Sequence, residues 1–182
     1  MLAFDIETLG LDMYNDRITC IAAFDKSAGI DRVWNFERFP AAKDRMTQEI
    51  CAIMDNATEI AAFNGIRFDL PFMQVFLGLS DEQVGRWVMK CFDPFELFKS
   101  SADTTFGLNL LLQTNGIPTK TADGKQAIVF AKEGRWKELE EYCRMDTVLT
   151  WEICSQPKII IPKIDSVLIA EPKKMAVSHI GT

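Results

Sequence analysis

The sequence lacks paired cysteines, long apolar runs and an excess of basic residues. Its five cysteines are odd in number and none forms a Cys-x-x-Cys pair, which argues against a disulfide framework or a zinc site. We therefore expect small buried thiols and a cytoplasmic or other reducing intracellular compartment. No window holds roughly 18 uncharged apolar residues, so we expect no membrane span.

The shortage of basic charge limits the way in which this protein can hold a polyanion. The net charge is −6 and the pI is about 4.9, which argues against a protein that grips long nucleic acid through many phosphate contacts. The net charge remains compatible with an enzyme that holds only the end of a nucleic-acid strand. Part of the negative charge would then come from carboxylates that a metal ion neutralises. The 182 residues, 48% of them hydrophobic, suit one globular domain with a real core.

Apolar alternation and turn residues predict the order of the elements. We expect strands at 2–7, 17–24 and 32–36, a helix over 40–55, a strand at 58–63, a helix at about 69–78 and a strand at 87–92. Asp93 and Pro94 are expected to open the next helix, as N-cap and first helical residue. Further helices are predicted at about 105–114, 123–133 and 135–154. The first three strands have short links and the later ones have helical links, which predicts an α/β fold with a mixed five-stranded sheet flanked by helices.

The end of the chain differs in character from the rest. We expect one globular domain over residues 1–156 and a C-terminal tail over residues 157–182. The tail contains three prolines and two short β-like runs, KIII and SVLIA. It is compatible with an edge hairpin, with a segment that docks on a partner, or with a loose end.

Two acids stand in an apolar strand at the start of the chain. Leu2, Phe4 and Ile6 alternate onto one face, so Asp5 and Glu7 share the other. If this strand is central, both carboxylates lose hydration and repel each other. The alternative is that the strand end is exposed and that both acids are solvated.

Two further segments carry acids, one inside a long helix and one between a strand and a helix. Asp146 lies within the apolar stripe of the last long helix, four residues after Tyr142, so the two side chains are neighbours. A structural aspartate bonded to the backbone or to Tyr142 is the alternative. Asp69 follows Asn64 between a strand and a helix, where it would also serve as an N-cap and Asn64 as a turn residue.

The conjunction of these acids favours a metal centre. The ends of a first strand, a fourth strand and a late helix can converge at one edge of a mixed sheet. Carboxylate oxygens are the ligands that Mg²⁺ and Mn²⁺ prefer. Two such ions about 4 Å apart would clamp the attacking and leaving oxygens of a phosphodiester.

Three motifs in order resemble the DEDD exonuclease superfamily, which has a ribonuclease-H-like fold. They are FDIETLG with Asp5 and Glu7, NGIRFD with Asn64 and Asp69, and YCRMD with Tyr142 and Asp146. The sequences of the three motif segments, FDIET, FNGIRFDLPF and YCRMDTVL, are most similar to those of proofreading exonuclease domains of family B DNA polymerases. The resemblance spans about residues 2–154. It points to the tyrosine branch, since the only histidine, His179, lies in the tail.

The resemblance implies a role for each motif residue. Asp5, Glu7 and Asp146 would hold one divalent cation, and a second one would be held by Asp5 and, through water, by Asp69. Tyr142 would orient the attacking water. The chain at Thr8 and Leu9 would contact the 3′-terminal nucleotide, and the substrate-binding set is completed by Asn64 and Phe68.

We therefore expect a 3′→5′ exonuclease that hydrolyses single-stranded DNA to nucleoside 5′-monophosphates with two Mg²⁺ or Mn²⁺ ions. Action on RNA is one alternative, since no residue in the sequence indicates a 2′-hydroxyl preference. A non-catalytic nucleic-acid-binding subunit of the same fold is another. The tail is a candidate for contact with a replication or repair protein.

Overall fold

The central feature of the computed structural model, which describes residues 1–98, 107–119, 125–162 and 167–172, is a mixed β-sheet. Its strand order is β3-β2-β1-β4-β5. β1 pairs antiparallel with β2 and parallel with β4, and β5 runs parallel to β4. The predicted five-stranded mixed sheet is therefore confirmed. The strands are β1 (Leu2–Thr8), β2 (Ile18–Asp25), β3 (Ile30–Asn35), β4 (Ile60–Ala61) and β5 (Cys91–Phe92).

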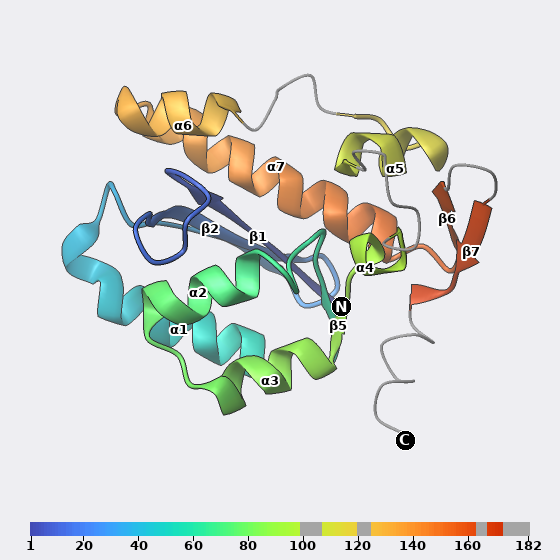
Figure 1. Cartoon of the computed structure of the whole chain (residues 1–182), viewed down its shortest axis with the longest axis horizontal. Helices are drawn as coiled ribbons and strands as arrows, with labels where there is room; N and C mark the ends of the chain where they lie inside the picture. The colour runs from blue at the N-terminus through green and yellow to red at the C-terminus, as the bar shows by residue number, and fades with distance from the viewer. Residues whose placement is uncertain (99–106, 120–124, 163–166, 173–182) are drawn as a thin grey trace.

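Helices cover both faces of this sheet. Figure 1 shows α1, α2 and α3 on one side of the strands and α7, flanked by α5 and α6, on the other. None of the described helices is both long and apolar enough to cross a lipid bilayer. The helical elements are η1 (Pro40–Ala42), α1 (Lys43–Asn56), α2 (Asp69–Leu77), α3 (Asp81–Met89), α4 (Pro94–Phe98), α5 (Leu108–Thr114), α6 (Lys125–Lys132) and α7 (Trp136–Cys154).

The central strand β1 divides the core into two layers. Leu2, Phe4 and Ile6 pack in a cluster with residues of α1, α2 and α3, as the alternation predicts. Ala3 points to the opposite face, into the cluster that contains residues of α5 and α7. Asp5 and Glu7 share that second face, so both acids point toward the α7 side of the sheet.

One predicted strand is wrong in most of its length. The run 87–92 begins inside α3, where Trp87 is fully buried, and only Cys91–Phe92 forms a strand. Ser80 begins this unpredicted helix, because its side chain accepts a hydrogen bond from the N–H of Gln83. The apolar run thus continues across the helix end at Lys90, so hydrophobicity alone does not mark the boundary.

Smaller differences concern boundaries. The helix expected over 40–55 starts as a 3-10 turn at Pro40, and α1 proper begins at Lys43. The strand expected over 58–63 is reduced to β4, which pairs with two residues on each side. The predicted helices 105–114 and 123–133 are present as α5 and α6, and their expected starts at 105–106 and 123–124 lie outside the described residues.

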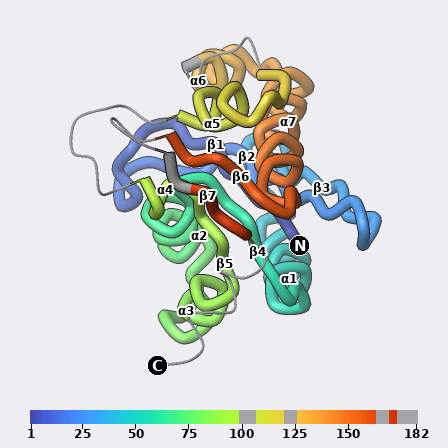
Figure 2. The backbone as a smooth tube through the Cα atoms, turned by 90° about the vertical axis from the view of Figure 1, so that its right-hand side faces the viewer, coloured from blue at the N-terminus to red at the C-terminus, as the bar shows by residue number. Residues whose placement is uncertain are grey.

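The tail contains a hairpin that packs on the domain. β6 (Ile159–Pro162) and β7 (Val167–Ala170) pair antiparallel in a separate two-stranded sheet. Ile159 and Ile161 are buried in the cluster that holds residues of α5 and α7. Asn115 joins the hairpin to the end of α5, since its side chain donates to the carbonyl of Ile160 and accepts from the N–H of the same residue. Figure 2 shows the hairpin beside α4 and α7.

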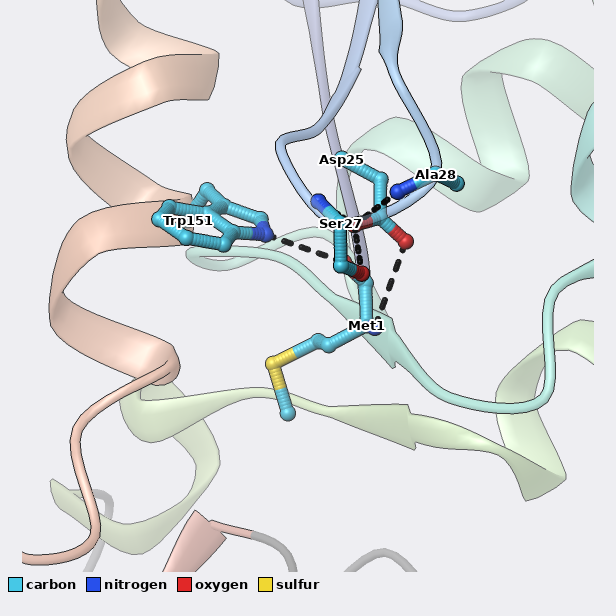
Figure 3. A network of polar contacts seen from close by, with 5 residues as sticks. All are labelled: Met1, Asp25, Ser27, Ala28 and Trp151. Carbon is cyan, nitrogen blue, oxygen red and sulfur yellow. Dashed lines mark hydrogen bonds and ion pairs between the residues drawn. The ribbon is translucent and has the colours of Figure 1, made fainter.

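A polar network joins the start of the chain to β2 and α7 (Figure 3). The Met1 amine lies 3.3 Å from Oδ2 of Asp25, and Oδ1 of Asp25 accepts from the N–H and hydroxyl of Ser27. The indole N–H of Trp151 donates to the Met1 carbonyl at 3.0 Å. These contacts fix the start of β1 against the C-terminal part of α7, which positions the rest of that helix over the sheet.

Candidate active site

β1 brings two acids toward the helix that packs on its second face. Asp5 lies opposite Ala22 and Glu7 lies opposite Cys20 in the register with β2. Both acids are half-buried. The expectation of two acids on one partly covered face is met, and neither is fully solvated.

Asp69 reaches this strand from the first residue of α2. Its Oδ1 accepts a hydrogen bond of 3.1 Å from the backbone N–H of Ile6, the residue between Asp5 and Glu7. Asp69 is not the N-cap: Phe68 occupies that position and no side chain caps the helix. The alternative reading of Asp69 as a cap is therefore wrong, and its carboxylate instead joins α2 to β1.

Burial dominates the protonation of Asp69. Burial, followed by the nearby charge of Asp93, raises the pKa of its carboxyl from 3.8 to about 7, although the hydrogen bond from the Ile6 N–H acts in the opposite direction. A buried acid of this kind is more easily ionised when a cation lies beside it.

Asp93 holds the turn that precedes Asp69. Its Oδ1 accepts from the backbone N–H of Asn64 at 2.9 Å, and its Oδ2 accepts from that of Ile66 at 3.1 Å. A third donor, the N–H of Phe95, is the capping contact that the sequence predicts for α4. Burial nevertheless raises the pKa of Asp93 from 3.8 to about 6. Sequence reasoning assigned Asp93 only the cap and missed its contact with the Asn64 turn, for which no local signal exists.

The turn itself needs a small residue and an unusual backbone. Asn64 adopts a left-handed conformation with φ of 64°, as the turn interpretation of this residue predicts. Gly65 follows it in close contact with the sheet: a Cβ added there would lie 2.4 Å from the Cβ of Ala62 and 3.3 Å from Cζ of Phe4. A side chain at residue 65 would therefore push the turn, and Asp69 with it, away from β1.

α7 completes the arrangement from the other side of β1. Tyr142, Cys143 and Asp146 are all buried on the face that packs on the sheet. The Cys143 thiol lies 3.7 Å from the backbone carbonyl of Asp5 and donates to it, a contact across 138 residues of sequence. Helical spacing places Tyr142 and Asp146 one turn apart on this face, next to Cys143.

Charged contacts at the surface fix the position of α7 along the strands. Arg144 pairs with Asp31 of β3 through its Nε and Nη2 atoms, the latter at 2.6 Å. Glu140 accepts from Arg38 and from the side-chain amide of Asn35. Glu140 precedes Cys143 by three residues and Arg144 follows it directly, so these contacts join α7 to β3 and to the segment after β3 close to the Cys143 position.

The donor atoms suit a divalent cation. Carboxylate oxygens of Asp5 and Glu7 and the sulfur of Cys143 all lie within 4.8 Å of one another, among the residues that the structure describes. Asp69 is next to this group, because it accepts a hydrogen bond from the N–H of Ile6, which lies between Asp5 and Glu7. Asp146 lies about one helical turn after Cys143 on α7. The sulfur was not foreseen, since the sequence treats the cysteines as small core residues; its position beside Tyr142 in YCRMD was the only available signal.

The expected substrate contacts lie on the chain next to these acids. Thr8 ends β1 and its hydroxyl donates to the carbonyl of Gly10 at 2.6 Å. The N–H of Leu9 donates to the carbonyl of Arg17. The ring of Phe68 is half-buried and lies 5.2 Å, centroid to centroid, from the buried ring of Phe72. Thr8 and Leu9 therefore follow Glu7 directly, and Phe68 directly precedes Asp69. Asn64 lies in the turn before α2.

Comparison with known proteins concerns both the sequence and the fold. A family model described as the RNase_H superfamily matches residues 2–156. Comparison with curated protein sequences gives no match. Among solved structures, the family B DNA polymerase from the hyperthermophilic archaeon Pyrobaculum calidifontis is similar, with a TM-score of 0.58 and 16% identity over 83% of this chain and 24% of that one.

A more distant similarity links the chain to an exonuclease. E. coli Exonuclease I, in a complex with a dT13 oligonucleotide, has a TM-score of 0.48 and 19% identity over 78% of this chain and 42% of that one. The chain thus spans about a quarter of the polymerase and about two fifths of Exonuclease I. At these identities the likeness concerns the fold.

Proposed function

This chain belongs to the RNase_H superfamily, and we propose that within it the protein is a metal-dependent 3′→5′ exonuclease of the tyrosine branch. The observation that carries the proposal is the hydrogen bond from the Ile6 N–H to Asp69. It joins the second acidic motif to the strand of the first. The contact of Cys143 with the Asp5 carbonyl then joins the third motif to the same strand.

The acids supply a site of concentrated negative charge at one edge of the sheet. Asp5, Glu7, Asp69 and Asp146 would hold two divalent cations, Mg²⁺ or Mn²⁺, which would activate water and neutralise charge on a phosphodiester. Asp69 would be ionised beside a cation, because a positive charge opposes the effect of burial on its carboxyl. Its Ile6 hydrogen bond holds that carboxylate in place without a change of rotamer.

Tyr142 and the edge residues would position the reactants. Tyr142 lies on the same helix face as Asp146, so its hydroxyl would orient the attacking water toward the scissile phosphorus. Thr8 and Leu9 would contact the terminal nucleotide at the end of β1. Phe68, supported by Phe72, offers a ring on which a base would stack. Asn64 supports the turn between these groups.

We propose single-stranded DNA as the substrate. This preference rests on the sequences of the three motifs, which resemble those of the proofreading domains of family B DNA polymerases. A substrate that is held only at its end also agrees with the small number of basic residues. An acidic protein that releases few counterions suits a short strand end and distributive action. The products would be nucleoside 5′-monophosphates.

The test is a gel assay with purified protein and 5′-labelled single strands of DNA and RNA of one sequence. Reactions contain Mg²⁺, Mn²⁺ or EDTA, and a duplicate DNA carries a blocked 3′ end. We expect a ladder that shortens from the 3′ end, needs metal and stops at the block. Asp5→Ala should reduce the rate by about 10²–10³-fold, because loss of a metal ligand removes several kcal/mol of transition-state stabilisation.

The matched control is Glu82→Ala, which removes an exposed acid on α3 that pairs only weakly with Arg86. Its activity should equal that of the wild type. Equal rates on DNA and RNA would refute the DNA preference. Cleavage of the blocked strand would refute the direction, and no metal-dependent cleavage of any strand by folded protein would favour a non-catalytic binding subunit.

We also propose that residues 1–156 form the catalytic domain and that the tail contacts a replication or repair protein. Ile159 and Ile161 are buried against α5 and α7, so deletion of all of 157–182 would damage the core as well. The informative deletion therefore removes only residues 173–182. It should leave activity on short oligonucleotides unchanged and abolish co-purification with the partner, whereas unchanged co-purification would refute a contact made through residues 173–182.

A further inference from the structure

Two thiols lie beside the acid pair of β1. Cys143 on α7 and Cys20 on β2 are both fully buried, and they pack in one cluster. Cys20 lies directly across from Glu7 in the strand register. The side chains of a registered pair point to the same face of a sheet, so Glu7 and Cys20 both face α7. Thiols and carboxylates from three different elements thus converge at one place.

The geometry of the three nearest donors is that of a compact coordination site. The Cys143 sulfur and oxygens of Asp5 and Glu7 lie within 4.8 Å of one another. Donors on a tetrahedral zinc ion lie roughly 3.5 Å apart, given bonds of about 2.0 Å to oxygen and 2.3 Å to sulfur. Rotation of the two half-buried carboxylates about their own side-chain bonds can close this difference without movement of the backbone.

The chemistry of this donor set differs from that of carboxylates alone. Mg²⁺ and Mn²⁺ are bound by oxygen, whereas a thiolate selects softer ions such as Zn²⁺. We propose that Asp5, Glu7 and Cys143 form a site for a thiophilic divalent cation, Zn²⁺ or Cd²⁺, with Cys143 as a thiolate ligand. On binding, the Cys143 proton leaves to solvent and the sulfur forms a bond to the metal; no oxidation state changes.

Cys20 has a supporting part in this site. Its side chain packs in the same buried cluster as Cys143, between β2 and α7, and limits movement of the Cys143 sulfur away from β1. Both sulfur atoms are inaccessible to bulk solvent, so the ion would enter from the side of the half-buried carboxylates.

The site overlaps the proposed catalytic centre, and this gives it a regulatory consequence that rests on the proposed function. A thiophilic ion that occupies Asp5 and Glu7 removes two ligands from Mg²⁺ or Mn²⁺. Zn²⁺ and Cd²⁺ would therefore compete with the hard ions and inhibit hydrolysis. The metal binding itself does not depend on whether the protein cleaves nucleic acid.

The test is a titration of the metal-stripped full chain with Co²⁺ and Cd²⁺, followed by ultraviolet absorption. A thiolate ligand gives a sulfur-to-metal charge-transfer band that carboxylates cannot produce. We expect this band in the wild type, with saturation at one equivalent, and its loss in Cys143→Ala and Cys143→Ser. Cys51→Ala, which removes a half-buried thiol on α1, is the matched control and should keep the band.

A parallel Mn²⁺ titration by calorimetry separates this proposal from the proposed function. Cys143→Ser should keep Mn²⁺ binding, and Asp5→Asn should weaken the binding of both ion classes. Absence of the charge-transfer band in the folded wild type, or its persistence in Cys143→Ser, overturns the thiophilic site whatever the nuclease assay shows. A band without any Mn²⁺ binding supports the thiophilic site and counts against the hard-metal exonuclease.

Discussion

Replacement of Asp93 by asparagine gives a quantitative test of the support beneath Asp69. The carboxylate of Asp93 accepts three backbone N–H groups, yet burial raises its pKa from 3.8 to about 6. The folded protein therefore holds the Asp93 proton more tightly than the unfolded chain does. As pH rises through this window, the folded state must give up a proton that the unfolded chain has already lost, so Asp93 makes the protein less stable.

The size of this effect follows from the two pKa values. A rise from 3.8 to about 6 corresponds to about 3 kcal/mol lost between strongly acidic and alkaline pH. About 1 kcal/mol of this loss falls between pH 5 and pH 8. Asp93→Asn has no charge to lose, so the wild type should lose this amount relative to the variant over that interval. Loss of the Asp93 charge also removes one cause of the raised pKa of Asp69, and this acts in the same direction.

The assay is urea denaturation of wild type and Asp93→Asn in EDTA at pH 5, 6, 7 and 8. The two proteins should differ in their free energy of unfolding at every pH, because the asparagine NH₂ faces a backbone N–H donor of the turn. This loss of a hydrogen bond costs the variant about 1–3 kcal/mol. The slope of the difference against pH is set by the charge alone. A difference that is independent of pH, or one in which the wild type gains stability toward pH 8, would refute this description of a strained buried carboxylate.

Three further changes test other parts of the structure. Tyr142→Phe should lower kcat by about 10- to 100-fold in steady-state kinetics on a labelled oligonucleotide and leave KM unchanged, because only the orientation of water is lost. Gly65→Ala should lower the free energy of unfolding by about 1–3 kcal/mol, since its Cβ would lie 2.4 Å from that of Ala62. Gly85→Ala, which meets open space within α3, is its control and should be neutral or stabilising by up to about 1 kcal/mol. Trp151→Phe should lower stability in thermal denaturation by about 1 kcal/mol, through loss of one hydrogen bond, with full activity.

Each of these has an outcome that contradicts it. An unchanged kcat would remove Tyr142 from the reaction, and a rise in KM alone would make it a binding residue. Equal effects of the two glycine substitutions would show that the turn at residue 65 can relax. Loss of activity with Trp151→Phe would mean that the position of α7 depends on this single contact.

Alternation along β1 was enough to predict which of its residues point toward α1, α2 and α3 and which share the opposite face with Asp5 and Glu7. Leu2, Phe4 and Ile6 occur on one face as expected, since a strand has a fixed period of two. The same argument fails for the run 87–92, because Trp87 is a buried residue of α3 whereas Phe92 is a buried residue of β5. Apolar residues at a helix end and at the next strand start are continuous in sequence, and only three-dimensional packing separates them.

The support of the site shows a similar limit. The motifs identify Asp5, Asp69 and Asp146, because each acid stands out in an apolar segment. Asp93 and Cys143 are inconspicuous by comparison: one has an obvious local role as a cap, and the other is an ordinary core thiol. Their additional contacts, to the Asn64 turn and to the Asp5 carbonyl, join segments far apart in sequence and have no local signature.

The distance along the chain between β1 and α7 governs when the site can form. The contact between Cys143 and Asp5 spans 138 residues, and the sheet face that carries the acids lacks its longest covering helix until α7 docks. Contacts of such long sequence separation form late in folding. During synthesis, the chain that has emerged as far as α6 already carries Asp5, Glu7 and Asp69, but it lacks the Tyr142–Asp146 segment. Under the proposed function, the nascent polypeptide is therefore inert toward nucleic acid until α7 has been made and has docked.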